Sequence, residues 1–197
     1  GIAALAVALF HIVCSPIGFV TDAFTRHVFI HGAYGVQLFF VISGLVIPLS
    51  MIKGEYSIRK FGKFMLKRTI RIEPTYIVTI LLCCALIILR RLILGEAGNP
   101  LPSLNEMVAN VTYVVPFTQF DWINPVFWTL GVELQYYLFI ALIWPAFNIF
   151  KSNWMLLLLP ALSWLLPAFF GTSFFFHHFG FFAVGCILAL FIAGRIP

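Results

Sequence analysis

Charged side chains are scarce in this chain: Asp, Glu, Lys and Arg make up only 10% of its 197 residues, whereas 62% are hydrophobic. A soluble domain is about a quarter charged and about half apolar, so this composition excludes that class. The apolar runs reach the roughly 20 residues that a helix needs to cross a bilayer. They lack the alternation of apolar and polar residues that outer-membrane barrel strands show. The sequence therefore predicts an all-α, polytopic bundle of transmembrane helices.

Signatures of several common chemistries are also missing. The chain has no Walker loop, no dinucleotide fingerprint and no Gly-x-Ser-x-Gly elbow. Its four cysteines lie in or beside apolar segments without the spacing of metal ligands; they are Cys14, Cys83, Cys84 and Cys186. We therefore expect no metal, no bound cofactor and no nucleic-acid partner.

Six apolar segments are long enough to be predicted as membrane spans. They cover residues 2–20, 34–52, 74–94, 126–147, 153–170 and 174–193. A weaker segment, 103–117, fits a short re-entrant or interfacial helix, and whether it crosses the membrane changes the topology. No repeat or linker divides the chain, so we expect a single transmembrane domain over 1–197. The chain starts at Gly1 and stops directly after an apolar run, which predicts a fragment truncated at both ends.

Basic residues are concentrated after the second predicted span. Seven of the twelve lie there: Lys53, Arg59, Lys60, Lys63, Lys67, Arg68 and Arg71. The positive-inside rule makes this loop cytoplasmic. Residues 57–72 also have the pattern of an amphipathic helix on the membrane surface. Two interpretations stay open: an anchor for anionic lipid heads, or a site for a phosphorylated cytosolic molecule held by the Arg68 and Arg71 guanidinium groups.

Two ionisable residues fall inside predicted spans, where such groups are energetically expensive and usually face a bundle interior. His11 lies about ten residues into the first span, roughly 15 Å below the entry surface. Glu133 is the only acid of the fourth span, and shares one helix face with Thr129, Tyr136 and Tyr137. Each has a structural interpretation as well as a chemical one, namely a hydrogen bond or ion pair that locks two helices together.

Four segments, taken in order, resemble the acyltransferase 3 family of membrane-bound O-acyltransferases, which includes O-antigen and exopolysaccharide acetylases. They are GIAALAVALFH at 1–11, GVQLFFVISGLVI at 35–47, KRTIRIEPTY at 67–76 and FWTLGVELQYYLF at 127–139. The third is similar to the family's Arg-x-x-Arg-Ile-x-Pro-x-Tyr stretch, and the fourth to its Trp-Ser-Leu-x-x-Glu-x-x-Tyr-Tyr pattern. The chain departs from the family at Gln37, where Asp is common, and at Glu73, an unexpected acid beside Arg71.

The resemblance implies a role for each matched position. His11 and Glu133 are the implied catalytic residues, with His11 acting as a base towards an acceptor hydroxyl or as a relay of the acyl group. Acyl-CoA binding is implied for three basic residues, Lys67, Arg68 and Arg71. Supporting positions are implied for Ser43, Tyr76 and Trp128.

The function implied by the resemblance is transfer of an acyl group, with acetyl the expected one, from cytosolic acyl-CoA to a hydroxyl of a glycan, a lipid-linked sugar or another cell-surface acceptor. The expected location is the bacterial cytoplasmic membrane. From the residues alone, a proton-coupled transporter that uses His11 and Glu133 as a relay is the main alternative. A non-catalytic membrane scaffold is the third.

Overall fold

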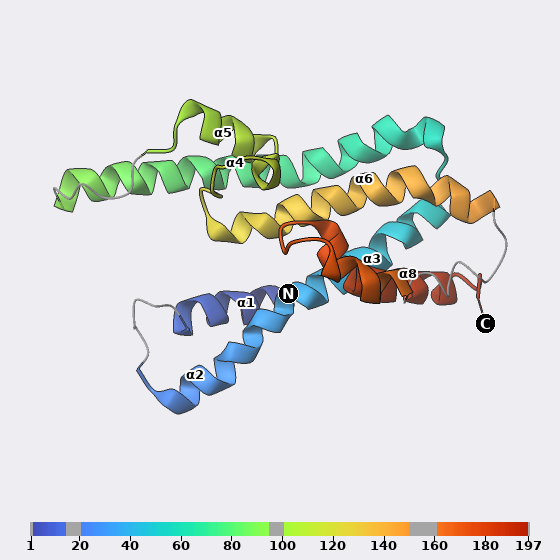
Figure 1. Ribbon diagram of the computed structural model, residues 1–197, viewed down its shortest axis with the longest axis horizontal. Coiled ribbons are helices and arrows are strands. Elements are labelled where there is room, and N and C mark those ends of the chain that lie inside the picture. The colour runs from blue at the N-terminus through green and yellow to red at the C-terminus, as the bar shows by residue number, and fades with distance from the viewer. Residues whose placement is uncertain (1, 15–20, 95–100, 150–160, 197) are drawn as a thin grey trace. The chain divides into compact units, whose positions relative to one another are not determined.

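The computed structural model describes residues 2–14, 21–94, 101–149 and 161–196, which form helices and connecting loops with no strand (Figure 1). The chain divides into two compact units. The first unit contains Gly1–Tyr56, Phe150–Thr172 and Phe176–Pro197, and the second contains Ser57–Ile149 and Ser173–Phe175. The predicted all-helical class is therefore confirmed for the described residues.

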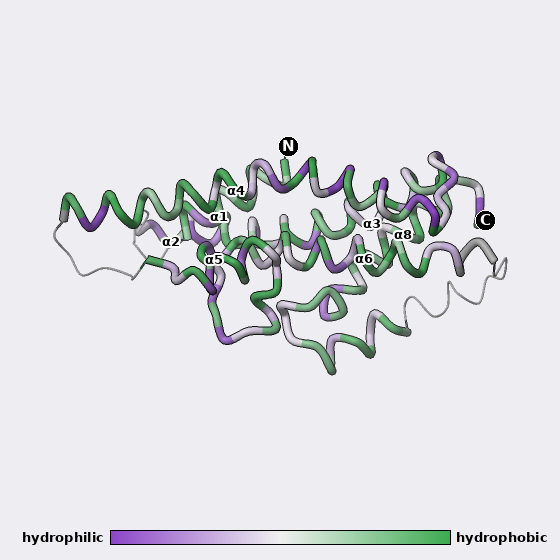
Figure 2. Tube along the Cα trace, turned by 90° about the horizontal axis from the view of Figure 1, so that it is seen from above, coloured by the Kyte–Doolittle hydropathy of each residue, from purple (hydrophilic) through white to green (hydrophobic). Residues whose placement is uncertain are grey.

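Among the residues that the structure describes, four helical stretches are long and apolar enough to cross a membrane, and Figure 2 shows how hydrophobic residues predominate along α4 and α8. These stretches are Ala23–Lys53, Ile58–Ile93, Pro125–Pro145 and Phe175–Ile192. They include the predicted spans 34–52, 74–94, 126–147 and 174–193 almost entirely. The prediction of six spans is wrong for the part of the chain that the structure describes.

The two predicted spans without a match have different outcomes. Helix α1, Ile2–Val13, has 12 residues and is about 18 Å long, which is short of the roughly 30 Å hydrocarbon core. Residues 15–20 of that predicted span lie outside the described residues, as do residues 153–160 of the fifth. The described remainder of the fifth ends in a 3-10 helix, Leu166–Ala168.

The separate surface helix predicted at 57–72 is not confirmed. A 3-10 turn, Ile58–Lys60, leads directly into α4, Phe61–Leu94. This helix has 34 residues in total and is not interrupted at Pro74. The prediction placed a break between the basic segment and the next span. A proline removes one backbone donor, but long apolar helices tolerate it because neighbouring groups satisfy the freed carbonyl. The basic residues therefore form the first turns of the same helix that carries the apolar span.

Close helix packing holds the first unit together. Helix α3, Gly35–Lys53, packs along α8, Phe179–Ile192. A Cβ on Gly44 would lie 2.3 Å from the carbonyl oxygen of Phe182, and one on Gly185 would lie 2.1 Å from that of Val41. Only glycine permits this backbone approach, which is how small residues bring membrane helices together. The rings of Phe40 and Phe182 stack beside the crossing, with centroids 4.8 Å apart.

Two shorter helical pieces lead into α3. Helix α2, Ala23–Phe29, begins at Asp22, whose carboxylate accepts a hydrogen bond from the backbone N–H of Thr25 at 2.7 Å. The 3-10 helix Ile30–Tyr34 follows and contacts α1. Asp22 satisfies a backbone donor that the first turn of α2 would otherwise leave open.

The second unit is built on α4 and α6, Trp128–Ile149, which contact one another. Between them in sequence come α5, Leu104–Val111, and two 3-10 turns, Val115–Phe117 and Pro125–Phe127. Helix α5 has eight residues, so it extends about 12 Å and cannot cross a bilayer. Its buried neighbours form one apolar cluster: Tyr76, Ile80, Cys84, Tyr113 and Phe127.

Candidate active site

Glu133 has a hydrogen-bond partner on its own helix. Both Glu133 and Tyr137 lie on α6, one turn apart, and the Tyr137 hydroxyl donates to Glu133 Oε1. Tyr137 is only 3% exposed. An acid among apolar residues requires such a donor, because an unpartnered buried carboxylate is strongly disfavoured. The predicted polar face of this helix is confirmed at these two positions.

Arg68 of α4 lies against the same tyrosine. Its guanidinium carbon is 5.7 Å from the centroid of the Tyr137 ring and 5.4 Å from that of Phe64, within the range of cation–π attraction. The Phe64 ring is nearly perpendicular to that of Tyr137, at 83° and 6.5 Å. Glu133 also acts electrostatically on Arg68. The structure therefore brings Arg68 of α4 and Glu133 of α6 into one cluster of opposite charges around Tyr137. Both residues lie in the segments that carry the family resemblance.

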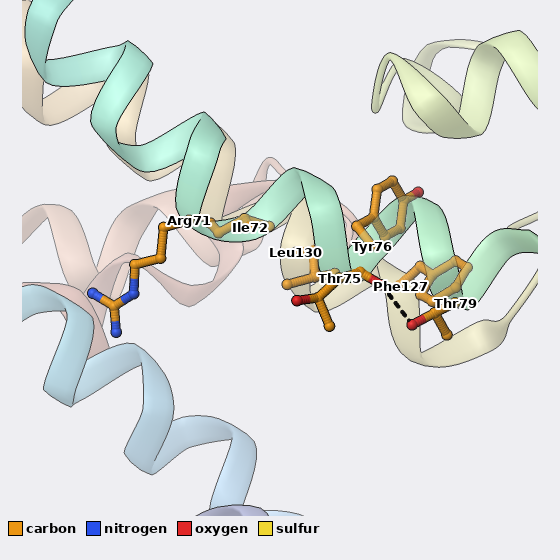
Figure 3. A pocket seen from close by; sticks show the side chains of 7 residues that line it. All are labelled: Arg71, Ile72, Thr75, Tyr76, Thr79, Phe127 and Leu130. Carbon is orange, nitrogen blue, oxygen red and sulfur yellow. Dashed lines mark hydrogen bonds between the residues drawn. The ribbon is translucent and has the colours of Figure 1, made fainter.

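Arg71, one turn after Arg68, stands at one end of a hollow in the second unit (Figure 3). From α4, the hollow is lined by Arg71, Ile72, Thr75, Tyr76 and Thr79. Phe127, in the 3-10 turn before α6, and Leu130, in the first turn of α6, line it from the other side. Its volume is about 220 Å³. We call this hollow the α4–α6 groove.

The other end of the α4–α6 groove is an aromatic wall. The Tyr76 ring stacks on Tyr113 at 4.7 Å and meets the edge of Phe127 at 4.8 Å. The Tyr76 hydroxyl donates to the backbone oxygen of Asn110 at 3.0 Å. Burial raises the pKa of Tyr113, and the charge of Glu73 raises it further, so this phenol stays protonated at neutral pH.

The Asn110 side chain fixes the loop behind that wall. Its amide group donates to the backbone oxygens of Glu106 and Asp121, and its oxygen accepts from the backbone N–H of Ile123. Asn110 is fully buried. Because all three bonds go to backbone atoms, this residue joins α5 to the segment that precedes α6.

The remaining predicted site residues are distributed over both units. In the first unit, His11 is exposed in the last turn of α1, and Ser43 is half-buried on α3 beside Gly44. In the second unit, Lys67 is exposed on α4, and Trp128 is half-buried at the first position of α6. The roles implied for these four residues stay predictions.

Several residues of the site were not recognised in the sequence. Tyr137 was placed on the right helix face but not as the partner of Glu133, although the four-residue spacing carries that signal. Phe127 and Leu130 had no signal of their own, because only packing brings them against α4. No group of three His, Cys, Asp or Glu side chains able to hold a metal occurs within 2–14, 21–94, 101–149 and 161–196.

Apolar helices of spanning length, together with an acid and an arginine that both contact Tyr137, define an integral membrane protein with a charged cluster inside one of its units. The family model described as "Acyltransferase domain", of the acyltransferase 3 type, matches residues 1–195. The chain therefore belongs to this acyltransferase family, as the four sequence segments had predicted. Comparison with curated proteins and with solved structures gives no match.

Proposed function

We propose that this protein moves an acyl group, acetyl in the simplest case, from cytosolic acyl-CoA to a hydroxyl group of a glycan or lipid-linked sugar, in a bacterial cytoplasmic membrane. Membership of the acyltransferase family supports the reaction class. The observation that carries the assignment to this site is the cluster of Arg68, Glu133 and Tyr137, which holds matched family positions from two helices together.

Binding of the donor is the task of the basic residues. Guanidinium groups form paired hydrogen bonds with phosphate oxygens, which suits Arg68 and Arg71 to the phosphates of CoA. Lys67 adds a third positive charge one turn before Arg71 on the same helix. Glu133, which accepts a hydrogen bond from Tyr137, orients His11 or the acceptor hydroxyl rather than the donor.

Transfer of the acyl group follows from the chemistry of a thioester and an alcohol. His11 takes the proton of the acceptor hydroxyl, and the oxygen attacks the thioester carbonyl carbon. The carbon–sulfur bond then breaks, the ester stays on the acceptor, and the CoA thiolate leaves and is protonated. An imidazole suits this step because its unperturbed pKa lies near neutrality.

The test is acyl transfer by the full-length protein in membrane vesicles with radiolabelled acetyl-CoA on the cytoplasmic side. We expect label in a glycan or lipid-linked fraction, and its loss in His11→Ala. The matched control is His27→Ala, which removes another exposed histidine of the first unit without touching a matched segment. No label with acetyl or longer donors, together with proton-coupled solute movement that needs His11, would contradict the proposal and favour a transporter.

A further inference from the structure

The two ends of the α4–α6 groove differ in charge. Its α4 residues recur at positions 71, 72, 75, 76 and 79, which places them along one face of the helix. Arg71 and Thr79 are eight residues apart, or about 12 Å along the axis. Figure 3 shows the Arg71 side chain extending away from the end where Thr79 and Phe127 lie. A ligand in the groove would therefore meet a positive charge at one end only.

The lining beyond Arg71 is almost entirely apolar. Ile72, Leu130 and the two aromatic rings supply carbon surface. The hydroxyl groups come from Thr75 and Thr79, and Thr79 Oγ1 already donates to the backbone oxygen of Thr75 at 2.8 Å. Such a lining complements a slender arm that is attached to an anion, rather than a second charged group.

The size of the groove limits what it can hold. Its volume of about 220 Å³ is below the roughly 300–1,000 Å³ of sites that enclose a drug-sized molecule. The groove can therefore take only part of a ligand. The charged part must remain outside the groove, at the open end next to Arg71.

The far end is closed by a wall whose position is fixed from behind. Tyr76 is held between Tyr113 and Phe127, and its hydroxyl is bonded to the Asn110 backbone. Phe127 is 5% exposed and Tyr76 is 2% exposed, so neither ring can swing into solvent without opening the cluster. Densely packed interiors resist such changes, so the wall sets a hard limit to the length of an occupant.

We propose that the α4–α6 groove holds the slender arm of the acyl donor that ends in the thioester, with the donor's anionic end at Arg71, and that Phe127 limits the acyl group to a short chain. This inference rests on the proposed function and adds to it the residue that sets chain length. Truncation of Phe127 should then admit donors with longer acyl chains. A larger side chain at Thr79 should fill the groove and exclude even donors with short acyl chains.

The experiment compares donors of increasing length, from acetyl-CoA to octanoyl-CoA, with the full-length protein in vesicles. We expect wild type to prefer acetyl-CoA and Phe127→Ala to raise the octanoyl-to-acetyl ratio of kcat/KM at least tenfold. Thr79→Leu should lower kcat/KM for every donor, through KM. The matched control is Phe117→Ala, because Phe117 is 71% exposed and lies outside the groove.

Binding of the same labelled donors, measured without acceptor, separates this inference from the proposed reaction. If wild type transfers no acyl group but Phe127→Ala still shifts the binding ratio towards octanoyl-CoA, the groove is supported and the reaction is contradicted. If both groove variants keep the wild-type melting temperature and the wild-type ratios, the inference is overturned. Displacement of bound acetyl-CoA by a short-chain phosphatidylglycerol, with Phe127→Ala leaving the donor ratio unchanged, would also overturn it and assign the groove to lipid.

Discussion

Tyr137 donates its phenolic hydrogen to Glu133 and also presents its ring to Arg68, 5.7 Å from the guanidinium carbon. One side chain thus contacts both an acid on its own helix α6 and an arginine on α4. A carboxylate that accepts a hydrogen bond from a neighbouring side chain is held in one orientation. We infer that Tyr137 is a positioning residue for this pair, and two substitutions separate its two contacts.

Tyr137→Phe keeps the ring beside Arg68 and removes only the hydroxyl. A hydrogen bond to a charged group contributes about 1.5–3 kcal/mol, so we expect kcat to fall about 10- to 100-fold. KM for acetyl-CoA should change little, because the guanidinium keeps its aromatic neighbours. The measurement is initial-rate kinetics in vesicles. Tyr34→Phe, at an exposed position of the first unit, is the control, and a kcat equal to wild type in Tyr137→Phe would contradict the role.

Arg68→Lys tests the other contact of Tyr137, which is the one between its ring and the Arg68 guanidinium group. Lysine keeps the charge but loses the planar fork that pairs with phosphate and lies against the Phe64 and Tyr137 rings. We expect KM for acetyl-CoA to rise about tenfold, which corresponds to roughly 1.4 kcal/mol, while Arg59→Lys, at an exposed position outside the cluster, leaves KM unchanged. Equal KM values in both variants would exclude a donor-binding role for the Arg68 guanidinium.

The sequence predicted most reliably the features that depend on local composition. The spans at 34–52, 126–147 and 174–193 follow from uninterrupted apolar length, which is enough to identify a membrane helix. The sequence pattern predicted the basic stretch at 57–72 and the span at 74–94 as separate elements, which meet near Pro74. The structure continues α4 through it, so the basic segment and the span are one helix.

Part of the site was also visible in the sequence. Glu133 and Tyr137 share a face by spacing alone, and their hydrogen bond confirms that prediction. The α4–α6 groove could not be predicted, because Phe127 and Leu130 are separated from α4 by more than 30 residues and meet it only through tertiary packing. The burial of Asn110 likewise depends on the loop that folds back over it.

Asn110→Ala should destabilise the second unit. The substitution removes three hydrogen bonds and leaves partly buried backbone groups of Asp121 and Ile123 without their partner. Each such loss costs about 1–3 kcal/mol, so we expect the free energy of unfolding in detergent to fall by about 2–4 kcal/mol. Asn105→Ala, at an exposed position of the same helix, is the control. A difference below about 0.5 kcal/mol between the two variants would show that the Asn110 bonds do not hold this loop.

The start of α2 should depend on pH. Hydrogen bonds from the Thr25 hydroxyl and then from its backbone N–H lower the pKa of Asp22 below 3.8. A carboxyl with a lowered pKa in the fold stabilises it above the unfolded pKa, and that contribution is lost as the pH falls through the folded value. Hydrogen exchange at the Thr25 amide should therefore be protected above about pH 4 and lose protection in stronger acid, after correction for intrinsic rates. Asp22→Asn should abolish this pH dependence; an unchanged profile would contradict the capping role.

Gly185→Ala should weaken the α3–α8 pair. The added Cβ would lie 2.1 Å from the carbonyl oxygen of Val41, and 2.6 Å from the backbone nitrogen of Leu45, so backbone rather than a flexible side chain must move. Overpacking of this kind costs about 1–3 kcal/mol, and we expect thermal unfolding in detergent to shift downwards accordingly. Gly62→Ala is the control, because a Cβ there meets nothing within 4 Å and alanine is the better helix former. If Gly185→Ala melts at or above the temperature of Gly62→Ala, the two helices do not depend on backbone contact, and their packing must rest on side chains such as Phe40 and Phe182.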